Sequence, residues 1–292
     1  MSRPWGVLGV PSSAAAHWPG VEKAPAAFRA TGLIEALRDA SVAVQDLGDL
    51  PVVRWEARPQ DGAPNNVAGV LRGLLEARGR IERIVDSGHR PFILGGECTL
   101  AIAVVSALVA RGVDVGLVYV DGGQDLMIPA DHPDEPILDG MGVAHLLDLP
   151  GTVDDIASIG PRSPLLTPQD VVFFGYADPE EDTHGLVPSA RFPAADVSAD
   201  PEGSAHAALA GLDVEHFVVH VDVDVLDFLL TPAADIPLYS QGLELEHLTR
   251  SLGLLVSDPR CAALLLVEYN PDHDPAGRAA ADIVDALVAA LS

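Results

Sequence analysis

The chain has 292 residues, of which 48% are hydrophobic, and a mean hydropathy of +0.25, so it can bury one large core and is not a disordered chain. Its formal charge of -26 opposes binding to nucleic acid and anionic lipid. The same charge would attract a metal ion or a cationic small molecule; alternatively, it serves only to keep the protein soluble. No apolar run approaches the roughly 20 residues that cross a bilayer, and the N-terminal stretch lacks a secretory core, so we expect a soluble, cytoplasmic protein with no membrane partner.

Short apolar runs rich in β-branched residues alternate with amphipathic stretches along the chain. In chain order, the pattern predicts strands over residues 5–10, 90–96, 115–121, 170–176, 216–227 and 261–270. It predicts helices over residues 67–88, 99–112, 243–257 and 278–292, and a loop over the Pro- and Asp-rich residues 127–140. Strands that are almost wholly apolar and alternate with helices predict an α/β class with a three-layer α/β/α fold and a central parallel sheet. Nothing reads as a linker, so we expect a single domain over residues 1–292.

Acidic residues fall where several of the predicted strands end. They are Asp121, Asp222, Asp224 and Glu268, with Glu97 and Cys98 in the glycine-rich turn after another strand. Ligands of parallel sheets bind at the carboxyl ends of the strands, and Asp222 and Asp224, two residues apart on a strand, would point to the same face. A single acid at a strand end is often a cap or turn residue, but several converging carboxylates repel one another unless a cation or a proton shares the site.

Four of these stretches, in order, resemble the arginase and agmatinase family of ureohydrolases. They are "ILGGECTLAIA" where the family has Gly-Gly-Asp-His-Ser, "VDGGQD" where it has Asp-Ala-His-x-Asp, "HVDVDVLDF" where it has Ser-x-Asp-x-Asp-x-x-Asp-Pro, and "LLLVEYNP" where it has Glu-x-Asn-Pro. The N-terminal residues 9–51 are also similar to the family's first strand, substrate-side loop and first helix. The resemblance runs nearly end to end and implies the arginase-type fold and a homo-oligomer.

The resemblance implies a metal centre, but this chain departs from the family's ligands. Family members hold two manganese ions with two histidines and four aspartates, and the aspartates match Asp121, Asp125, Asp222 and Asp224. The two histidines are replaced by Cys98 and Gly123, and glycine has no side chain to offer. We therefore expect one divalent ion (Mn, Fe or Zn) or none, with Cys98 as a ligand whose thiolate favours softer ions. Alternatively, Cys98 is a small buried apolar residue.

The residues around this centre also differ from the family. Asp139 replaces the family's loop histidine and Glu268 keeps a substrate-contacting position, so we assign both as catalytic. The family's substrate-contacting Asn and Thr align with Met127 and Ile236. The expected substrate-binding residues are Glu268, Met127, Glu135 and Asp178. For His220, on the same strand face as Asp222, we favour a structural hydrogen-bonded role, and His132 and His184 are weaker candidates for the site.

Three functions are compatible with these departures. The first is an arginase-like hydrolase that acts on a C–N bond of a guanidino or amidine-type small molecule through an altered, at most mononuclear metal site. Because of the missing ligands and loop histidine, we do not expect arginine hydrolysis at a normal rate. The second is a catalytically inactive protein that binds a ligand or regulates a partner. The third is an acidic edge that serves as a structural or regulatory cation site.

Overall fold

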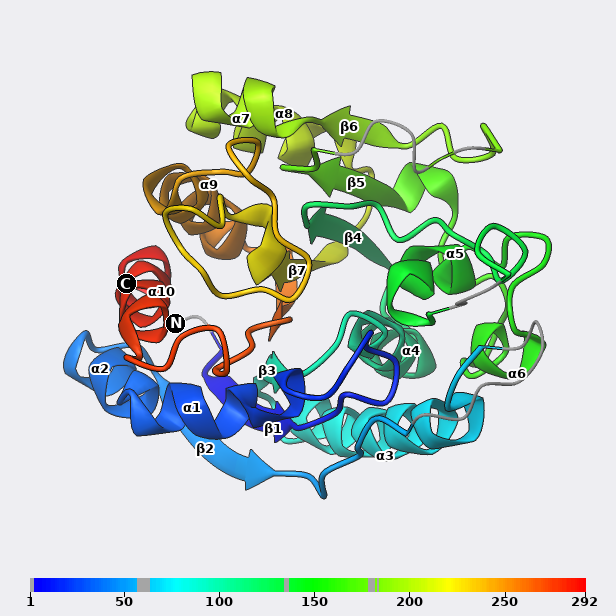
Figure 1. Cartoon of the computed structure of the whole chain (residues 1–292), viewed down its shortest axis with the longest axis horizontal. Coiled ribbons are helices and arrows are strands. Elements are labelled where there is room, and N and C mark those ends of the chain that lie inside the picture. Colours follow the sequence, from blue (N-terminus) through cyan, green and yellow to red (C-terminus); the bar gives the residue numbers. More distant parts are fainter. Residues whose placement is uncertain (1–2, 57–63, 134–136, 178–181, 183) are drawn as a thin grey trace.

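A parallel sheet forms the centre of the molecule. The computed structural model describes residues 3–56, 64–133, 137–177, 182 and 184–292. Within them, eight strands pair in the order β2-β1-β3-β8-β7-β4-β5-β6, every neighbouring pair parallel (Figure 1). The strands are β1 (Trp5–Val10), β2 (Val44–Asp49), β3 (Arg90–Gly95), β4 (Val115–Val120), β5 (Val171–Phe174), β6 (Ala190–Phe192), β7 (His216–Asp222) and β8 (Cys261–Val267).

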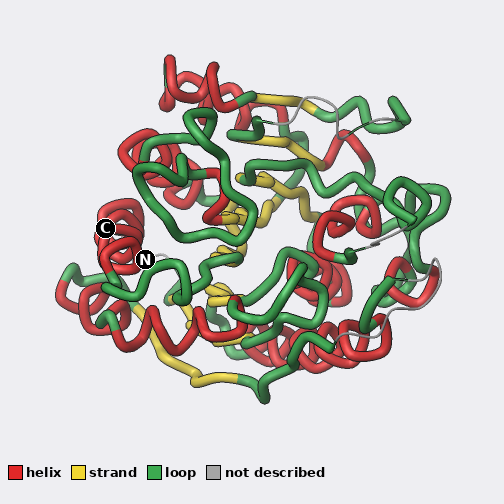
Figure 2. The backbone as a smooth tube through the Cα atoms, in the orientation of Figure 1, coloured by secondary structure: helices red, strands yellow, loops and turns green. Residues whose placement is uncertain are grey.

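Helices cover both faces of this sheet. One apolar core lies under α3 (Val67–Asp86), α4 (Leu100–Ala110), α5 (Gly142–Leu146) and α6 (Asp154–Ala157). The other lies under α1 (Ala24–Ala30), α2 (Leu33–Asp39), α7 (Ala194–Ala199), α8 (Pro201–Gly211), α9 (Leu245–Ser257) and α10 (Arg278–Leu291). Short 3-10 turns are η1 (Val21–Lys23), η2 (Asp139–Met141), η3 (Pro168–Asp170) and η4 (Val223–Val225). The helices therefore form two layers with the strands between them (Figure 2).

Hydrophobic patterning explains this layering. Strands β1, β4, β5 and β8 are buried along their whole length, as expected for strands covered on both faces. Helix α3 turns a stripe of apolar side chains to the sheet at helical spacing, from Val70 through Leu74 and Ala77 to Ile81 and Ile84. The prediction of a three-layer α/β/α fold with a central parallel sheet is confirmed.

The predicted boundaries need two corrections. The strand expected over residues 216–227 ends at Asp222, because Val223–Val225 turn into η4, and the strand expected over residues 261–270 ends at Val267. Strand β2 was not predicted because it is an edge strand whose residues are largely exposed, so it lacks an apolar run. No helix in the described part of the chain has both the length and the apolar character to span a membrane.

Candidate active site

The candidate site lies at the carboxyl ends of four adjacent strands, β3, β8, β7 and β4. Cys98 follows β3, Asp121 follows β4, Asp222 ends β7 and Glu268 follows β8. Because all the strands run in the same direction, residues distant in sequence reach one edge of the sheet. A cavity of about 490 Å³ opens there, within the roughly 300–1,000 Å³ typical of small-molecule sites.

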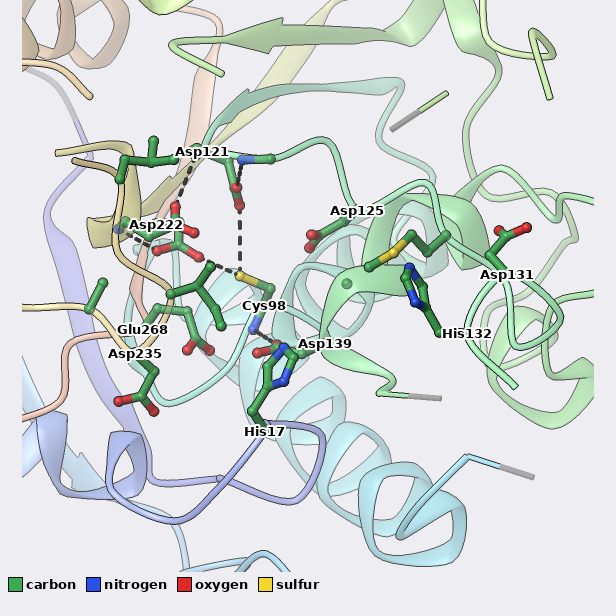
Figure 3. Close-up of a pocket in the computed structure, with 18 residues that line it drawn as sticks. His17, Cys98, Asp121, Asp125, Asp131, His132, Asp139, Asp222, Asp235 and Glu268 are labelled. Carbon is green, nitrogen blue, oxygen red and sulfur yellow. Dashed lines mark hydrogen bonds between the residues drawn. The ribbon is translucent and has the colours of Figure 1, made fainter. Parts of the chain in front are cut away.

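Cys98 occupies the floor of this cavity, among carboxylates (Figure 3). Its Sγ lies 2.9 Å from Oδ2 of Asp222 and 3.8 Å from Oδ2 of Asp121, and its backbone N–H donates to Oδ1 of Asp139 at 2.8 Å. Burial, followed by the negative charge of Asp222, raises the pKa of the Cys98 thiol well above its usual range. The thiol therefore faces acids and keeps its proton in the absence of a cation, which differs from a sulfur packed only against apolar neighbours.

The two aspartates of "DVD" reach the cavity by different routes. Asp222 ends β7, whereas Asp224 lies in η4, so strand geometry does not place them on a common face as expected. Instead, Oδ1 of Asp222 accepts the Asp224 backbone N–H at 2.7 Å, and Oδ1 of Asp224 accepts the Gly122 N–H at 2.9 Å. Burial raises the pKa of both carboxyls, and the negative charge of Asp224 raises that of Asp222 further.

The two aspartates of "VDGGQD" also make different contacts. Oδ1 of Asp121 accepts the Gly123 N–H at 2.7 Å, which leaves Oδ2 turned toward Cys98. Asp125 adopts a left-handed backbone conformation with φ 51°, and its Oδ2 accepts the hydroxyl of Tyr119. Asp121 thus faces the thiol, while Asp125 lines the cavity farther along and is held by a tyrosine.

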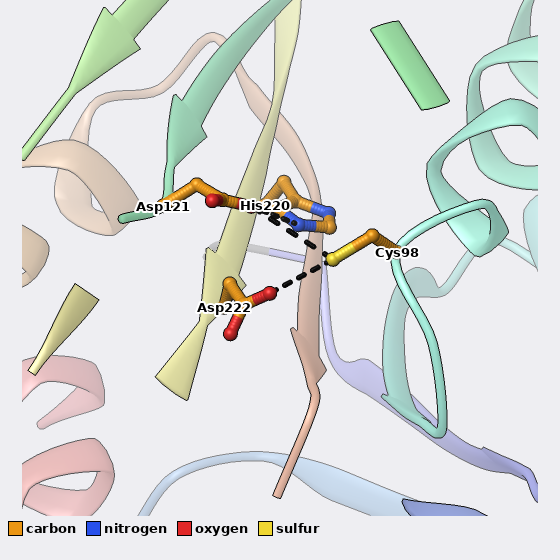
Figure 4. Close-up of side chains that lie close together, drawn as sticks. All are labelled: Cys98, Asp121, His220 and Asp222. Atoms are coloured by element: carbon orange, nitrogen blue, oxygen red, sulfur yellow. Dashed lines mark hydrogen bonds and ion pairs between the residues drawn. The ribbon is translucent and has the colours of Figure 1, made fainter. Parts of the chain in front are cut away.

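Beside Asp121 lies His220, whose side chain is fully buried (Figure 4). Its ring stacks on Tyr119 with centroids 4.2 Å apart, and Nε2 lies 3.6 Å from Oδ2 of Asp121, beyond hydrogen-bond length. Neither ring nitrogen has a hydrogen-bond partner among the described residues, which corrects the expectation of a hydrogen-bonded structural histidine. Burial lowers the pKa of His220, so the ring is neutral.

The two residues assigned as catalytic meet on the same floor. Burial, with the neighbouring Glu97 charge, raises the pKa of Asp139 to about 8, and burial with the Asp139 charge raises that of Glu268 well above its usual range. Glu268 has a left-handed φ of 63°, directly after β8. Glu97, expected at the same edge, turns away from the cavity and accepts hydrogen bonds from Ser12 Oγ at 2.9 Å and the Thr99 N–H at 3.1 Å.

Part of the cavity lining is apolar. Met127, Ile236 and Leu238 supply apolar surface, and His132 also lines the cavity. His184 is not among the lining residues and pairs with Asp131 at 2.9 Å. Glu135 and Asp178, both predicted to bind substrate, lie outside the described residues.

Three titratable lining residues, His17, Asp131 and Asp235, were not assigned to the site by the sequence analysis. All three come from loops. Asp235 Oδ1 accepts the Asn270 side-chain amide at 2.6 Å and lies 2.8 Å from His273 Nε2. The stretch "EYNP", already singled out for Glu268, carried a signal for Asp235 because its asparagine holds that carboxylate.

Comparison with known proteins places this chain in a family. The model of the arginase family matches residues 3–291. The chain belongs to the arginase family. Human arginase-1 is 27% identical to this arginase-family chain over 283 residues, covering 92% of the chain and 86% of the human protein. The arginase of Bacillus subtilis strain 168 is 23% identical and covers 99% and 98%.

Solved structures show the same fold. Arginase from Bacillus caldovelox has a TM-score of 0.89 at 22% identity, covering 99% of this chain and 98% of its own. Formimidoylglutamase from Bacillus subtilis has a TM-score of 0.75 at 16% identity, covering 100% and 87%. The resemblance seen in the four motifs is thus confirmed, and the central sheet and its flanking helices are those of the arginase fold.

Proposed function

We propose that this arginase-family chain hydrolyses a C–N bond in a guanidine or amidine, using one divalent metal ion held by Cys98, Asp121 and Asp222. The convergence of these three side chains on the cavity floor carries the proposal. The Sγ of Cys98 lies within 3.8 Å of one carboxylate oxygen of Asp121 and of one of Asp222, and all three residues are buried. Buried acids that repel one another are stabilised by a shared cation.

The site does not fit the pair of ions that the resemblance implies. Gly123 offers no side chain where the family has a histidine, and Asp125 is engaged by Tyr119. One ion fits, because one sulfur and two carboxylate donors approach one another from three different strands. A thiolate in the donor set favours zinc or ferrous iron over manganese.

The chain's own residues would divide the remaining tasks. A bound divalent ion supplies Lewis acidity toward water and the substrate. Glu268 lies beside this centre, and its carboxyl, once ionised next to a cation, can hold the cationic carbon–nitrogen group by charge. Asp139, on the cavity floor, can hold or pass a proton at the departing nitrogen, the task of a general acid or base.

The cavity wall supports a particular substrate class. Among the described lining residues there is no Arg or Lys, so a substrate carboxylate would have only the imidazoles of His17 and His132 as basic partners there. Acids on the floor attract a cation, and Met127, Ile236 and Leu238 offer an apolar wall. A guanidine or amidine with an apolar, uncharged body fits this lining better than an amino acid does. By contrast, the solved arginase of Entamoeba histolytica is in complex with the amino acid L-ornithine.

Turnover measured on defined metal forms tests this function. The metal-free protein is loaded separately with zinc, ferrous iron or manganese, and release of urea or ammonia is followed with alkylguanidines, aryl and alkyl amidines, and arginine. We expect turnover of an uncharged-body guanidine or amidine by the zinc or iron form, with arginine much slower.

The matched variants are Asp222→Asn, on the cavity floor, and Asp213→Asn, at an exposed position. The first should lower kcat/KM by at least about 100-fold, since it removes a proposed metal ligand, and the second should leave it unchanged. Absence of turnover in every metal form would overturn the hydrolase.

One observation favours a second candidate, a catalytically inactive ligand-binding protein. The carboxylate that stands in for the family's loop histidine, Asp139, is turned toward the Cys98 backbone and accepts its N–H at 2.8 Å. A ligand from the same panel that raises the thermal unfolding temperature without being hydrolysed would support this function instead.

A further inference from the structure

The most unusual side chain near the floor is His220, which none of the roles above uses. Within the described part of the chain, neither nitrogen of this fully buried imidazole has a hydrogen-bond partner, which is costly because polar atoms lose their contacts with water and gain none in return. His220 comes from the middle of the sheet, two residues before Asp222, and its ring is oriented by the stacked ring of Tyr119.

The ring of His220 lies close to the proposed metal ligands. Nε2 of His220 lies 3.6 Å from Oδ2 of Asp121, and Cys98 Sγ lies 3.8 Å from the same oxygen. One donor atom from each of Cys98, Asp121, His220 and Asp222 lies within 4.8 Å of every other (Figure 4). A tetrahedral zinc ion with bonds of about 2.0–2.3 Å sets its donors roughly 3.3–3.6 Å apart, so these positions need only small shifts.

We infer that His220 is the nitrogen ligand of this centre and completes a four-ligand set of one sulfur, one nitrogen and two carboxylate oxygens. This inference rests on the proposed function only for the presence of a metal ion. The family's two histidine positions are held here by Cys98 and Gly123, and the imidazole comes instead from the strand position where the family motif has serine. The set is of the kind that zinc or ferrous iron occupies.

Two further contacts fit this role. Asp125 accepts the hydroxyl of Tyr119, and Tyr119 stacks on His220, so Asp125 orients the ligand ring through the tyrosine without binding the ion itself. His220 is absent from the residues that line the cavity, whereas the other three ligands line it. The imidazole would therefore hold the ion from the protein interior, while the other three ligands would hold it from the cavity lining.

Binding of a metal ion by the Cys98 sulfur would release the thiol proton. The S–H proton, which makes the 2.9 Å contact with Asp222 Oδ2, passes to solvent as the sulfur–metal bond forms, with no change in oxidation state. The carboxylate oxygen released from that hydrogen bond is then available to the ion.

Metal binding to the metal-free full chain tests the inference without any assay of turnover. Zinc is titrated against a competing chelator, and cobalt is used as the spectroscopic probe, because its absorption reports thiolate ligation and coordination number. The wild type should bind about one ion with a cobalt spectrum typical of four or five ligands that include a thiolate. His220→Gln should keep the thiolate band but bind zinc at least about 10- to 100-fold more weakly, the loss that follows removal of even an outer-sphere partner.

His216→Gln is the matched control, because His216 begins the same strand at its opposite end. Its zinc affinity should equal that of the wild type. If His220→Gln does not fold, the wild type labelled with nitrogen-15 at its histidines answers the same question. Zinc should then move the signals of one of the ten histidine rings to metal-bound positions.

The outcomes separate the two proposals. Zinc binding that is unchanged in His220→Gln, with no histidine signal shifted, overturns the ligand assignment and leaves the hydrolase standing. Zinc binding through His220 without turnover of any guanidine or amidine supports the assignment and overturns the hydrolase. Failure of the wild type to bind any ion overturns both.

Discussion

At Gly123, a missing side chain separates this protein from the two-ion centre that its motifs resemble. Gly123 lines the cavity, and its N–H donates to Asp121 at 2.7 Å, so its backbone still supports the site although it cannot bind a metal. The neighbouring Gly122 is more constrained, because a Cβ there would lie 3.0 Å from the Asp224 carbonyl oxygen. Gly123 stands where the family motif has a histidine, so it is the position at which to test a new ligand.

Gly123→His should restore capacity for a second ion. A histidine there restores the residue type that the family motif has at this position, and carboxylates with one nitrogen suit manganese. Metal analysis after dialysis against manganese should show an increase from about one to about two ions per chain, the stoichiometry of a two-metal hydrolase. Gly123→Ala, which adds bulk without a donor, should stay at the wild-type value. Equal metal content in both variants would contradict this explanation of the lost site.

At the scale of elements, the turn between β3 and α4 holds Cys98 by backbone packing. Gly96 precedes Glu97 and Cys98, and its carbonyl oxygen accepts the Glu268 N–H at 2.7 Å, which joins the ends of β3 and β8. A Cβ at Gly96 would lie only 1.6 Å from the Ser12 carbonyl oxygen in the loop after β1. Three strand ends therefore meet at a point where a side chain does not fit.

Gly96→Ala should destabilise the protein by at least about 2–3 kcal/mol, because a backbone atom cannot rotate out of the way as a side chain can. Gly79→Ala is the control, since Gly79 lies in α3 with no atom within 4 Å of an added Cβ. That change should stabilise by up to about 1 kcal/mol through helix propensity. Urea unfolding followed by circular dichroism measures both, and a Gly96→Ala stability equal to that of the wild type would show that the turn can open.

At the scale of the whole molecule, the net charge of -26 dominates. Like charges on a compact surface repel one another, and this repulsion falls when the chain unfolds and expands. Salt shortens the range of the repulsion, from about 30 Å at 0.01 M to about 3 Å at 1 M. The net negative charge therefore lowers the stability of the folded state.

The thermal unfolding temperature of the metal-free protein at pH 7.5 should rise as potassium chloride is added. Nearer the sequence pI of about 4.4, where the net charge is small, the same salt should have much less effect. Differential scanning calorimetry at both pH values measures this. A salt effect of the same size at both would assign the stabilisation to something other than screening of net charge.

The sequence by itself determined the layers and the edge where the site lies. Short apolar runs rich in β-branched residues, such as residues 115–120, are typical of strands covered on both faces. In a parallel sheet their carboxyl ends share one edge, so Asp121 and Glu268 were expected there. Helix α3 followed from its apolar stripe. Edge strand β2 could not be predicted in this way, because its largely exposed residues form no apolar run.

Only the tertiary structure decided which neighbours each polar group has. Glu97 and Cys98 are adjacent in one turn, yet Glu97 bonds to Ser12 while Cys98 faces Asp222, since successive side chains of a turn point in different directions. The setting of His220 depends on β4 as well as β7, because Tyr119 orients its ring and Asp121 lies beside its Nε2. Periodicity places a residue on a face of its own strand, but the donors around it come from strands distant in sequence, which meet only when the sheet forms.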